Sequence, residues 1–246
     1  ADNRFIFFVS DRDGRKSMYR MNPDGSGQTL VVSGGDNRGY RQADNGRTAF
    51  ISNRRGIWEL FMDGQPVTRA DWFAWQPGGA RVVIELGKMA LFTVSGPGQP
   101  VQKVVEGAET RNASWAPDGS RIVFASNREG NSKIFTVRPD GGGLQALTPA
   151  DRWCQVPAWS FDGRWIAFVM GEGPGWGLYR MAPDGSNWLR LADNPHPGRG
   201  LAWSPDSRQL AFVSRDLDIY VVNASGSGLR QLTTDPAADY EPAWSR

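Results

Sequence analysis

The 246-residue chain is poor in residues on which many metal sites, catalytic sites and disulfide crosslinks depend. It has one cysteine, one histidine and four lysines. A lone cysteine excludes an intramolecular disulfide and any metal site built from several cysteines. A single histidine excludes zinc centres that need several imidazoles. It allows at most one catalytic triad, which would have to use His196.

Long hydrophobic runs and a strong charge imbalance are also missing. The longest uninterrupted apolar stretch is six residues, from Trp165 to Met170, whereas a membrane-spanning helix needs about 20. We therefore expect a chain that does not span a membrane. The 28 basic and 26 acidic residues leave a net charge of +2. Nucleic acid is not an expected partner, because binding a phosphate backbone usually needs a clustered basic excess.

The sequence does contain an internal repeat. The segment from Ser114 to Phe124 returns from Ala158 to Phe168 and from Ala202 to Phe212, and weaker copies end at Phe50 and Ile84. The last apolar residue of each copy marks the repeat, and successive markers are 34 to 44 residues apart, with an average of 41. This period is typical of propeller blades. The markers, which run through a single expected domain over residues 1–246, are Phe8, Phe50, Ile84, Phe124, Phe168 and Phe212.

Each repeat is expected to form four short strands. The first ends at a tryptophan, whose place Arg41 takes in the second repeat, and the second is the apolar run after a turn such as Asp118-Gly119. Asp-Gly dipeptides such as Asp140-Gly141 then provide a tight turn between the third and fourth strands. The third strand carries an aliphatic–aromatic pair, expected at Met18-Tyr19, Ile57-Trp58, Leu91-Phe92, Ile134-Phe135, Leu178-Tyr179 and Ile219-Tyr220.

Six such repeats predict an all-β fold, a six-bladed β-propeller with four-stranded antiparallel blades. The chain begins on what should be a second strand, from Arg4 to Val9, and ends on what should be a first strand, from Glu241 to Trp244. We therefore expect the C-terminal strand to join the N-terminal blade and close the ring, which would hide the free edges of an open sheet.

The repeated motifs resemble those of the TolB-type propeller family. They include Pro157-Ala158-Trp159-Ser160, the segment from Ser126 to Gly130 and Leu147-Thr148. The resemblance implies a bacterial, non-catalytic protein-binding propeller in the periplasm or outside the cell, without a cofactor. It also implies a partner at the mouth of the central channel, such as the peptidoglycan-associated lipoprotein of the Gram-negative envelope.

The candidate partner-binding residues lie where the chain enters each inner strand, three or four residues before the repeated tryptophan or close by. Arginine and aromatic side chains, which protein-binding surfaces favour, are frequent among them. A protein or peptide ligand would suit such a ring. The predicted residues are Arg38, Trp72, Arg111, Asn112, Trp153, Gln155, Arg199, Tyr240 and Glu241.

Two other functions stay open: a scaffold or sensor domain of a larger protein, and a glycan- or peptide-processing enzyme. An enzyme is not expected, because no Gly-x-Ser-x-Gly elbow precedes a helix. Asp239 and Glu241 lie in one strand, whereas glycoside cleavage needs carboxyl groups that face one another across the sugar.

The remaining conspicuous residues are expected to be structural. The repeated tryptophans should pack between blades, His196 should lie in a surface loop, and Cys154 should be a buried or inert thiol. The hairpins at Asp11–Asp13 and Asn127–Glu129 lack the dense oxygen ligands of a calcium loop. They are expected to be ion-paired, hydrogen-bonded turns.

Overall fold

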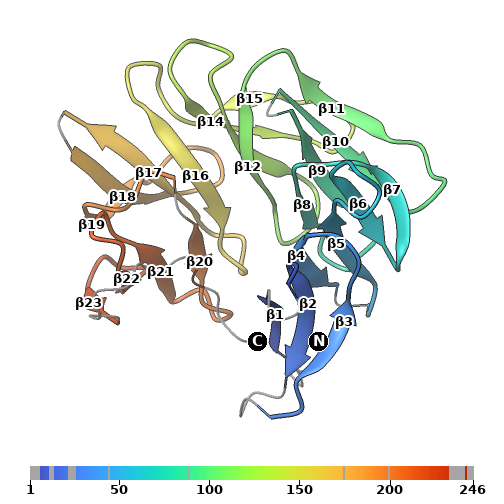
Figure 1. Ribbon diagram of the computed structural model, residues 1–246. Helices are drawn as coiled ribbons and strands as arrows, with labels where there is room; N and C mark the ends of the chain where they lie inside the picture. The colour runs from blue at the N-terminus through green and yellow to red at the C-terminus, as the bar shows by residue number, and fades with distance from the viewer. Residues whose placement is uncertain are drawn as a thin grey trace. The chain divides into compact units, whose positions relative to one another are not determined.

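The computed structural model describes residues 6–10, 14–21, 26–43, 45–87, 89–173, 175–198, 200–232 and 242. Throughout these ranges the regular structure is β-strand, and the strands form six antiparallel sheets that follow one another along the chain (Figure 1). No helix in the described ranges has the length and apolar character needed to cross a membrane.

In each sheet the strands are hydrogen-bonded in chain order, as in a meander. The first sheet contains β1 (Ile6–Ser10), β2 (Ser17–Met21) and β3 (Thr29–Val32). The second contains β4 (Asn37–Gln42), β5 (Thr48–Ser52), β6 (Glu59–Met62) and β7 (Gln65–Arg69). The third contains β8 (Trp72–Trp75), β9 (Val82–Leu86), β10 (Ala90–Val94) and β11 (Gln102–Glu106).

The last three sheets repeat this plan. The fourth contains β12 (Thr110–Trp115), β13 (Ile122–Ser126), β14 (Lys133–Val137) and β15 (Gln145–Ala146). The fifth contains β16 (Cys154–Trp159), β17 (Ile166–Glu172), β18 (Gly175–Met181) and β19 (Leu189–Asp193). The sixth contains β20 (Leu201–Trp203), β21 (Gln209–Val213), β22 (Ile219–Asn223) and β23 (Arg230–Gln231).

Six short antiparallel sheets in succession confirm the predicted class, a six-bladed β-propeller. Five sheets have four strands, and the first has three among the described residues. Its expected fourth strand, from Glu241 to Trp244, lies outside the described residues except for Pro242. Closure of the ring by that segment stays a prediction.

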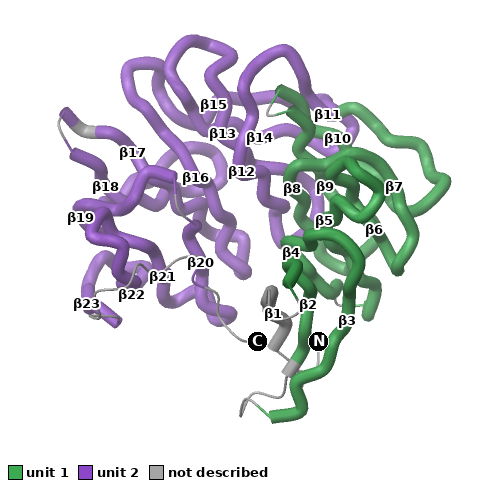
Figure 2. The backbone as a smooth tube through the Cα atoms, viewed as in Figure 1, with its two compact units in different colours: residues 1–103, 246 green, residues 104–245 purple. Residues whose placement is uncertain are grey.

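The chain divides into two compact units, residues 1–103 and residues 104–245 (Figure 2). Buried apolar clusters join neighbouring sheets inside each unit. In the first unit, side chains of β5 and β6 pack with side chains of β8, β9 and β10. In the second, one cluster joins the fourth and fifth sheets and another joins the fifth and sixth. The fifth sheet is covered on both faces by these last two clusters, and the residues of β17 from Ile166 to Met170 are accordingly all apolar and buried.

Five of the six predicted marker residues are buried in the second strands of their sheets. Phe50, Ile84, Phe124, Phe168 and Phe212 are at most 3% exposed and all lie in the second strand of their sheets. Four of them pair across the sheet with an aromatic ring of the third strand, with ring centroids 5.2 to 5.8 Å apart. Such stacked pairs stabilise a sheet beyond the area that they bury.

In the second sheet the predicted aliphatic–aromatic pair is wrong. Phe61 is the residue that pairs with the marker Phe50, so Leu60-Phe61 occupies the place assigned to Ile57-Trp58. Leu60 and Phe61 are buried, while Ile57 is 40% exposed. The six-residue connection between β5 and β6 ends in two apolar residues that imitate the start of a strand, which explains the error.

The predicted place of Arg41 is also wrong by one residue. Gln42 pairs with Thr48 at the position where Trp115 pairs with Ile122 in the fourth sheet. The turn between β4 and β5 is one residue shorter than the corresponding turn in the fourth sheet. Counting back from the marker therefore places the tryptophan position one residue too early in the chain. Gln42 therefore replaces the repeated tryptophan in this sheet.

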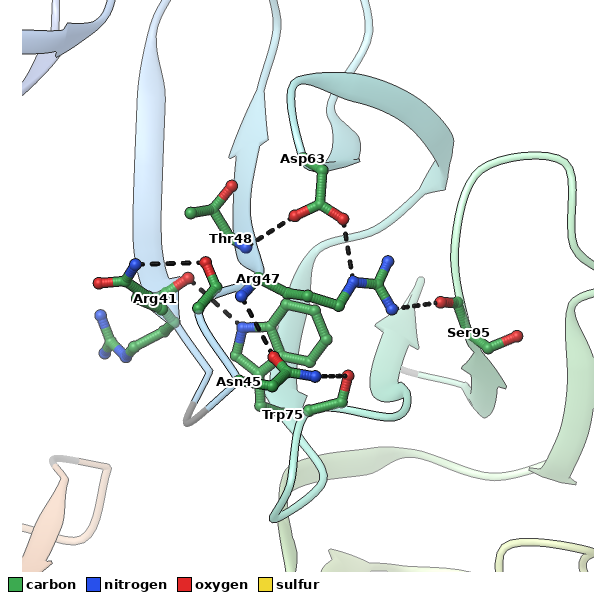
Figure 3. A network of polar contacts seen from close by, with 10 residues as sticks. Arg41, Asn45, Arg47, Thr48, Asp63, Trp75 and Ser95 are labelled. Atoms are coloured by element: carbon green, nitrogen blue, oxygen red, sulfur yellow. Dashed lines mark hydrogen bonds and ion pairs between the residues drawn. The ribbon is translucent and has the colours of Figure 1, made fainter. Parts of the chain in front are cut away.

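The repeated tryptophans bridge neighbouring sheets, as predicted, where their contacts are described. The indole N–H of Trp75 donates to the carbonyl of Arg41 at 3.4 Å, and that of Trp203 donates to the carbonyl of Ala158 at 3.1 Å. Around Trp75 the guanidinium of Arg47 lies 5.5 Å from the ring centroid and donates to Asp63 and to the Ser95 carbonyl (Figure 3). Trp244 lies outside the described residues.

The Ser-x-Arg-x-Gly hairpins cap the aromatic pairs. The Arg128 guanidinium lies 5.4 Å from the rings of both Phe124 and Phe135, and its Nε donates to the Ser126 hydroxyl at 3.2 Å. Arg54 repeats the arrangement in the second sheet. The prediction of hydrogen-bonded, ion-paired turns is confirmed for the Asn127–Glu129 hairpin, where Glu129 pairs with Lys133 at 2.6 Å. Residues 11–13 lie outside the described residues.

Candidate functional site

Four predicted site residues occupy one repeated position. Each of them lies in the first strand of its sheet and pairs with the second strand three residues after the position that pairs with the repeated tryptophan. These residues are Arg38, Trp72, Arg111 and Gln155. Arg38, Trp72 and Arg111 are exposed and Gln155 is half-buried. In β4, β12 and β16 the preceding residue (Asn37, Thr110 or Cys154) is buried, so this position is the first in those strands to present its side chain.

A β-bulge follows this position in three of the four sheets. The register shifts directly after Arg38, Arg111 and Gln155. The next residue in each case has a left-handed backbone: φ is 66° at Gly39, 55° at Asn112 and 53° at Val156. A bulge twists its strand and redirects nearby side chains. Asn112, also predicted as a site residue, is thus the exposed bulge residue itself.

In the first unit the predicted residue Arg38 lies against an aromatic ring. Its guanidinium is 4.2 Å from the ring centroid of Trp58 and its Nη2 donates to the carbonyl of Asp71 at 3.0 Å. Stacking and hydrogen bonding restrict the guanidinium while leaving it exposed, so less conformational entropy remains to be lost on binding.

Exposed apolar side chains come from the same strand ends. Trp72 is 37% exposed, Ile57 is 40% exposed and Met89 is 51% exposed. Ile57 and Met89 lie in the connections that follow β5 and β9, next to the positions that pair with Arg38 and Trp72. Trp58 was missed at the sequence level because its motif imitates a strand. The sequence does carry a sign of its role, because Trp58 occupies the loop position at which the fourth sheet has the polar residue Ser132.

In the second unit Arg111 is ion-paired with Glu109. The amide nitrogen of Glu109 donates to the Asn127 side-chain oxygen at 3.0 Å, and Asn127 Nδ2 approaches the Glu109 carboxylate at 3.5 Å. The hairpin motif of the fourth sheet thus holds Glu109, and Glu109 orients Arg111. Both side chains are substantially exposed, so solvent screens the pair and its effect is positional more than energetic.

The fifth sheet contributes a second polar group in this unit. With the Gln155 amide oriented to satisfy both neighbours, its nitrogen donates to the Pro197 carbonyl at 2.8 Å and its oxygen accepts from the indole N–H of Trp153. Trp153 is 47% exposed. The amide therefore ties an exposed tryptophan to the loop that leads into β20.

His196 lies in the same loop. Its backbone nitrogen donates to the Val213 carbonyl at 2.8 Å, and its Nδ1 accepts from the amide of Gly198 at 3.1 Å. His196 lies in a loop, as predicted, although its ring is half-buried.

Three predicted site residues, Arg199, Tyr240 and Glu241, lie outside the described residues. Their proposed part in binding therefore rests on the sequence. Cys154, the first residue of β16, is fully buried, and burial raises the pKa of its thiol to about 11. The expectation of a buried thiol is confirmed.

The acidic groups with perturbed titration are turn residues. Hydrogen bonds from the following backbone amides and serine hydroxyls hold the pKa values of Asp118 and Asp184 below the ordinary aspartate value. Such carboxylates stabilise their turns as anions. Within the described ranges, no group of three or more His, Cys, Asp and Glu side chains is arranged to hold a metal ion.

The repeats, the sheets and the exposed strand ends agree with a known family. The sequence model of the TolB β-propeller domain matches residues 72–199, just over half of the chain. The chain belongs to the TolB β-propeller family. The match covers the third, fourth and fifth sheets and therefore includes Trp72, Arg111 and Gln155.

Proteins of several kinds have solved structures with this fold. TolB from Acinetobacter baumannii superposes with a TM-score of 0.72 at 16% identity, covering 93% of this chain and 62% of that one. An oligogalacturonate lyase from Vibrio parahaemolyticus gives 0.73 at 15% identity, covering 93% and 74%. A puromycin-hydrolysing peptidase from Mycobacterium tuberculosis gives 0.71 at 15% identity, covering 92% and 42%.

These identities show a shared fold and no more. The chain spans less than two thirds of the TolB chain and less than half of the peptidase chain. The same fold accordingly occurs in a protein named TolB and in enzymes alike, and function has to be argued from the exposed residues of this chain.

Proposed function

We propose that this TolB-type propeller is a non-catalytic binding module that engages a protein or peptide through the starts of its inner strands. The observation that carries the proposal is the repeated position held by Arg38, Trp72, Arg111 and Gln155, which offers arginine, aromatic and amide side chains from four successive sheets. Arginine and tryptophan dominate the energetics of protein interfaces.

The local contacts favour a macromolecular partner. Arg38 is held by Trp58 and Asp71, and Arg111 by Glu109, so these groups are ordered before a partner arrives. Exposed Trp72 and Trp153 add apolar area beside them. The family resemblance supports an envelope partner of the peptidoglycan-associated lipoprotein type and a periplasmic location. Arg199, Tyr240 and Glu241 are proposed to complete the same surface.

Binding to the peptidoglycan-associated lipoprotein of the source organism tests the proposal. Calorimetry should detect binding by the wild-type chain. The triple variant Arg38→Gln, Trp72→Ala, Arg111→Gln should bind about 30-fold more weakly or worse, since two or more interface hot spots are lost. The control variant Arg138→Gln, Leu144→Ala, Arg230→Gln changes the charge equally at exposed positions away from the starts of the inner strands and should bind like the wild type.

Two results would contradict this function. Equal binding by both triple variants would remove the strand ends as the binding surface and favour the scaffold or sensor alternative. Turnover of a polysaccharide or peptide by the purified chain would favour the enzyme alternative, which the lyase and peptidase of the same fold keep in view.

A further inference from the structure

A cavity of about 590 Å³ lies at the other end of the strands, inside the second unit. It is open to solvent and is bounded by the turns that join β16 to β17 and β20 to β21, together with the turn that follows β22. These turns are at the opposite end of β16 from Gln155, so the proposed partner surface does not include the cavity. Its lining residues are Asp162, Arg164, Trp165, Asp206, Ser207, Arg208, Asn223, Ala224 and Ser225.

The aromatic wall of the cavity is a departure from the repeat. Trp165 stands where the fourth sheet has Arg121 and the sixth has Gln209. The Arg180 guanidinium lies 3.5 Å from the Trp165 ring centroid and its Nε donates to the Ala224 carbonyl at 2.5 Å. Arg180 is not part of the cavity lining. It therefore fixes the indole from outside, and the half-buried Trp165 side chain forms part of the cavity lining.

Two arginines flank this wall at equivalent positions. Arg164 and Arg208 each follow the turn residue in the left-handed conformation, where the fourth sheet has Ser120. Both are exposed. The charge of Arg208 acts on neighbouring Asp206, where it helps the Ser204 hydroxyl and the Arg208 backbone amide to hold the pKa of that carboxyl below its ordinary value. Guanidinium groups bind carboxylates and phosphates through paired N–H donors.

Acceptors complete the lining. One oxygen of Asp162 accepts from the Ser160 hydroxyl at 2.6 Å and from the Arg164 amide at 3.0 Å. Asp206 is bound in the same way by Ser204 and the Arg208 amide. Each carboxylate keeps its second oxygen outside these turn contacts, which suits hydroxyl donors. Two anions in one lining would oppose a doubly charged phosphate more than a singly charged carboxylate.

We propose that this cavity binds a carboxylated sugar, such as a hexuronic acid or a short chain of them. Trp165 would receive the C–H face of the ring, Arg164 and Arg208 the carboxylate, and Asp162 and Asp206 the hydroxyl groups. Burying an apolar ring face against tryptophan while pairing each polar group matches the way compact ligand sites are built. The inference is independent of the partner surface proposed above.

Calorimetry and ligand-observed NMR with D-glucuronate and its disaccharide test this site at low ionic strength. The wild-type chain should bind both. The Arg164→Gln, Arg208→Gln variant should bind at least about tenfold more weakly, because two charge-assisted contacts are removed. Trp165→Gln, which installs the residue of the sixth sheet, should have a similar effect. Arg138→Gln, Arg152→Gln is the charge-matched control and should retain wild-type binding.

Three results would overturn the proposal. D-glucose binding as well as D-glucuronate would remove the carboxylate requirement. Glucose 6-phosphate binding more tightly than D-glucuronate would make the cavity a phosphate site. Absence of binding in the wild type, or equal loss in the control variant, would show that the cavity is not a site for these sugars. Because all substituted arginines are exposed, unchanged melting temperatures should accompany each binding result.

Discussion

The thiol of Cys154 illustrates how burial in the propeller core changes the pKa of a single residue. It is fully buried at the start of β16, and its pKa is raised from 9.0 to about 11, chiefly by burial. Below pH 9 both folded and unfolded chains keep the proton. Above pH 9 the unfolded chain loses it first, so deprotonation favours unfolding and the stability contributed by the neutral thiol falls as pH approaches 11.

We therefore predict a difference in pH dependence between the wild type and Cys154→Ala. Urea denaturation at pH 8 and pH 10.5 should show the wild type losing up to about 2 kcal/mol more than the variant across this interval, since each pKa unit corresponds to about 1.4 kcal/mol. Tyrosines and lysines titrate in both proteins and cancel in the comparison. The same loss in both proteins would mean that the thiol titrates normally.

At the scale of the element, two hairpins carry the same ion pair with the charges exchanged. Arg55 and Glu59 lie 3.6 Å apart in the second sheet, and Glu129 and Lys133 lie 2.6 Å apart in the fourth. In both cases the second residue opens the third strand and is the buried partner, with 12% and 8% of its side chain exposed. Where a charged residue opens the third strand, an opposite charge four residues earlier accompanies it, and the fold accepts either sign.

This arrangement predicts that Glu129→Gln destabilises the chain by about 1–2 kcal/mol, because Lys133 would be left largely buried without its anion. Chemical denaturation measures the loss. Asp151→Asn removes the anion of an exposed pair with Arg152, 3.7 Å apart, and should cost less than about 0.5 kcal/mol. Reversing both charges, Glu129→Lys with Lys133→Glu, should recover most of the lost stability, and failure to do so would contradict the reading.

Sequence periodicity was sufficient for most elements because each marker residue must be buried between two strands. Phe124, Phe168 and Phe212 lie where predicted. The predictions for the second sheet were wrong because the short turn before β5 and the apolar end of the β5–β6 connection both shift the apparent register. Local hydrophobicity cannot distinguish Ile57-Trp58 from Leu60-Phe61 until the pairing with Phe50 is known.

The candidate sites were only partly accessible to the same reasoning. Arg38, Trp72, Arg111 and Gln155 could be found by counting along the repeat, because they share one position. The contact between Arg38 and Trp58 joins β4 to the connection between β5 and β6, and finding it required coordinates. Trp165 could have been noticed as a departure from the repeat, but the cavity beside it depends on turns that are about 40 residues apart.

At the scale of the whole molecule, the first sheet is the incomplete one, with three strands among the described residues where the others have four. We predict that deletion of residues 240–246 lowers the melting temperature by about 5 °C or more, because a missing inner strand would cost several kcal/mol. Calorimetry measures the change, with removal of Arg246 alone as the control. An unchanged transition in the longer deletion would contradict closure of the propeller by this segment.

The outermost strands bear on how the protein behaves at high concentration. β15 and β23 are two residues long, β7 contains Pro66, and β11 carries Lys103. Each of these features denies another chain the long row of unpaired backbone groups that sheet extension needs. Through these four strands, crowded copies of this molecule accordingly have little opportunity to pair edge to edge, which is a useful property for a protein whose described regular structure is all β-strand.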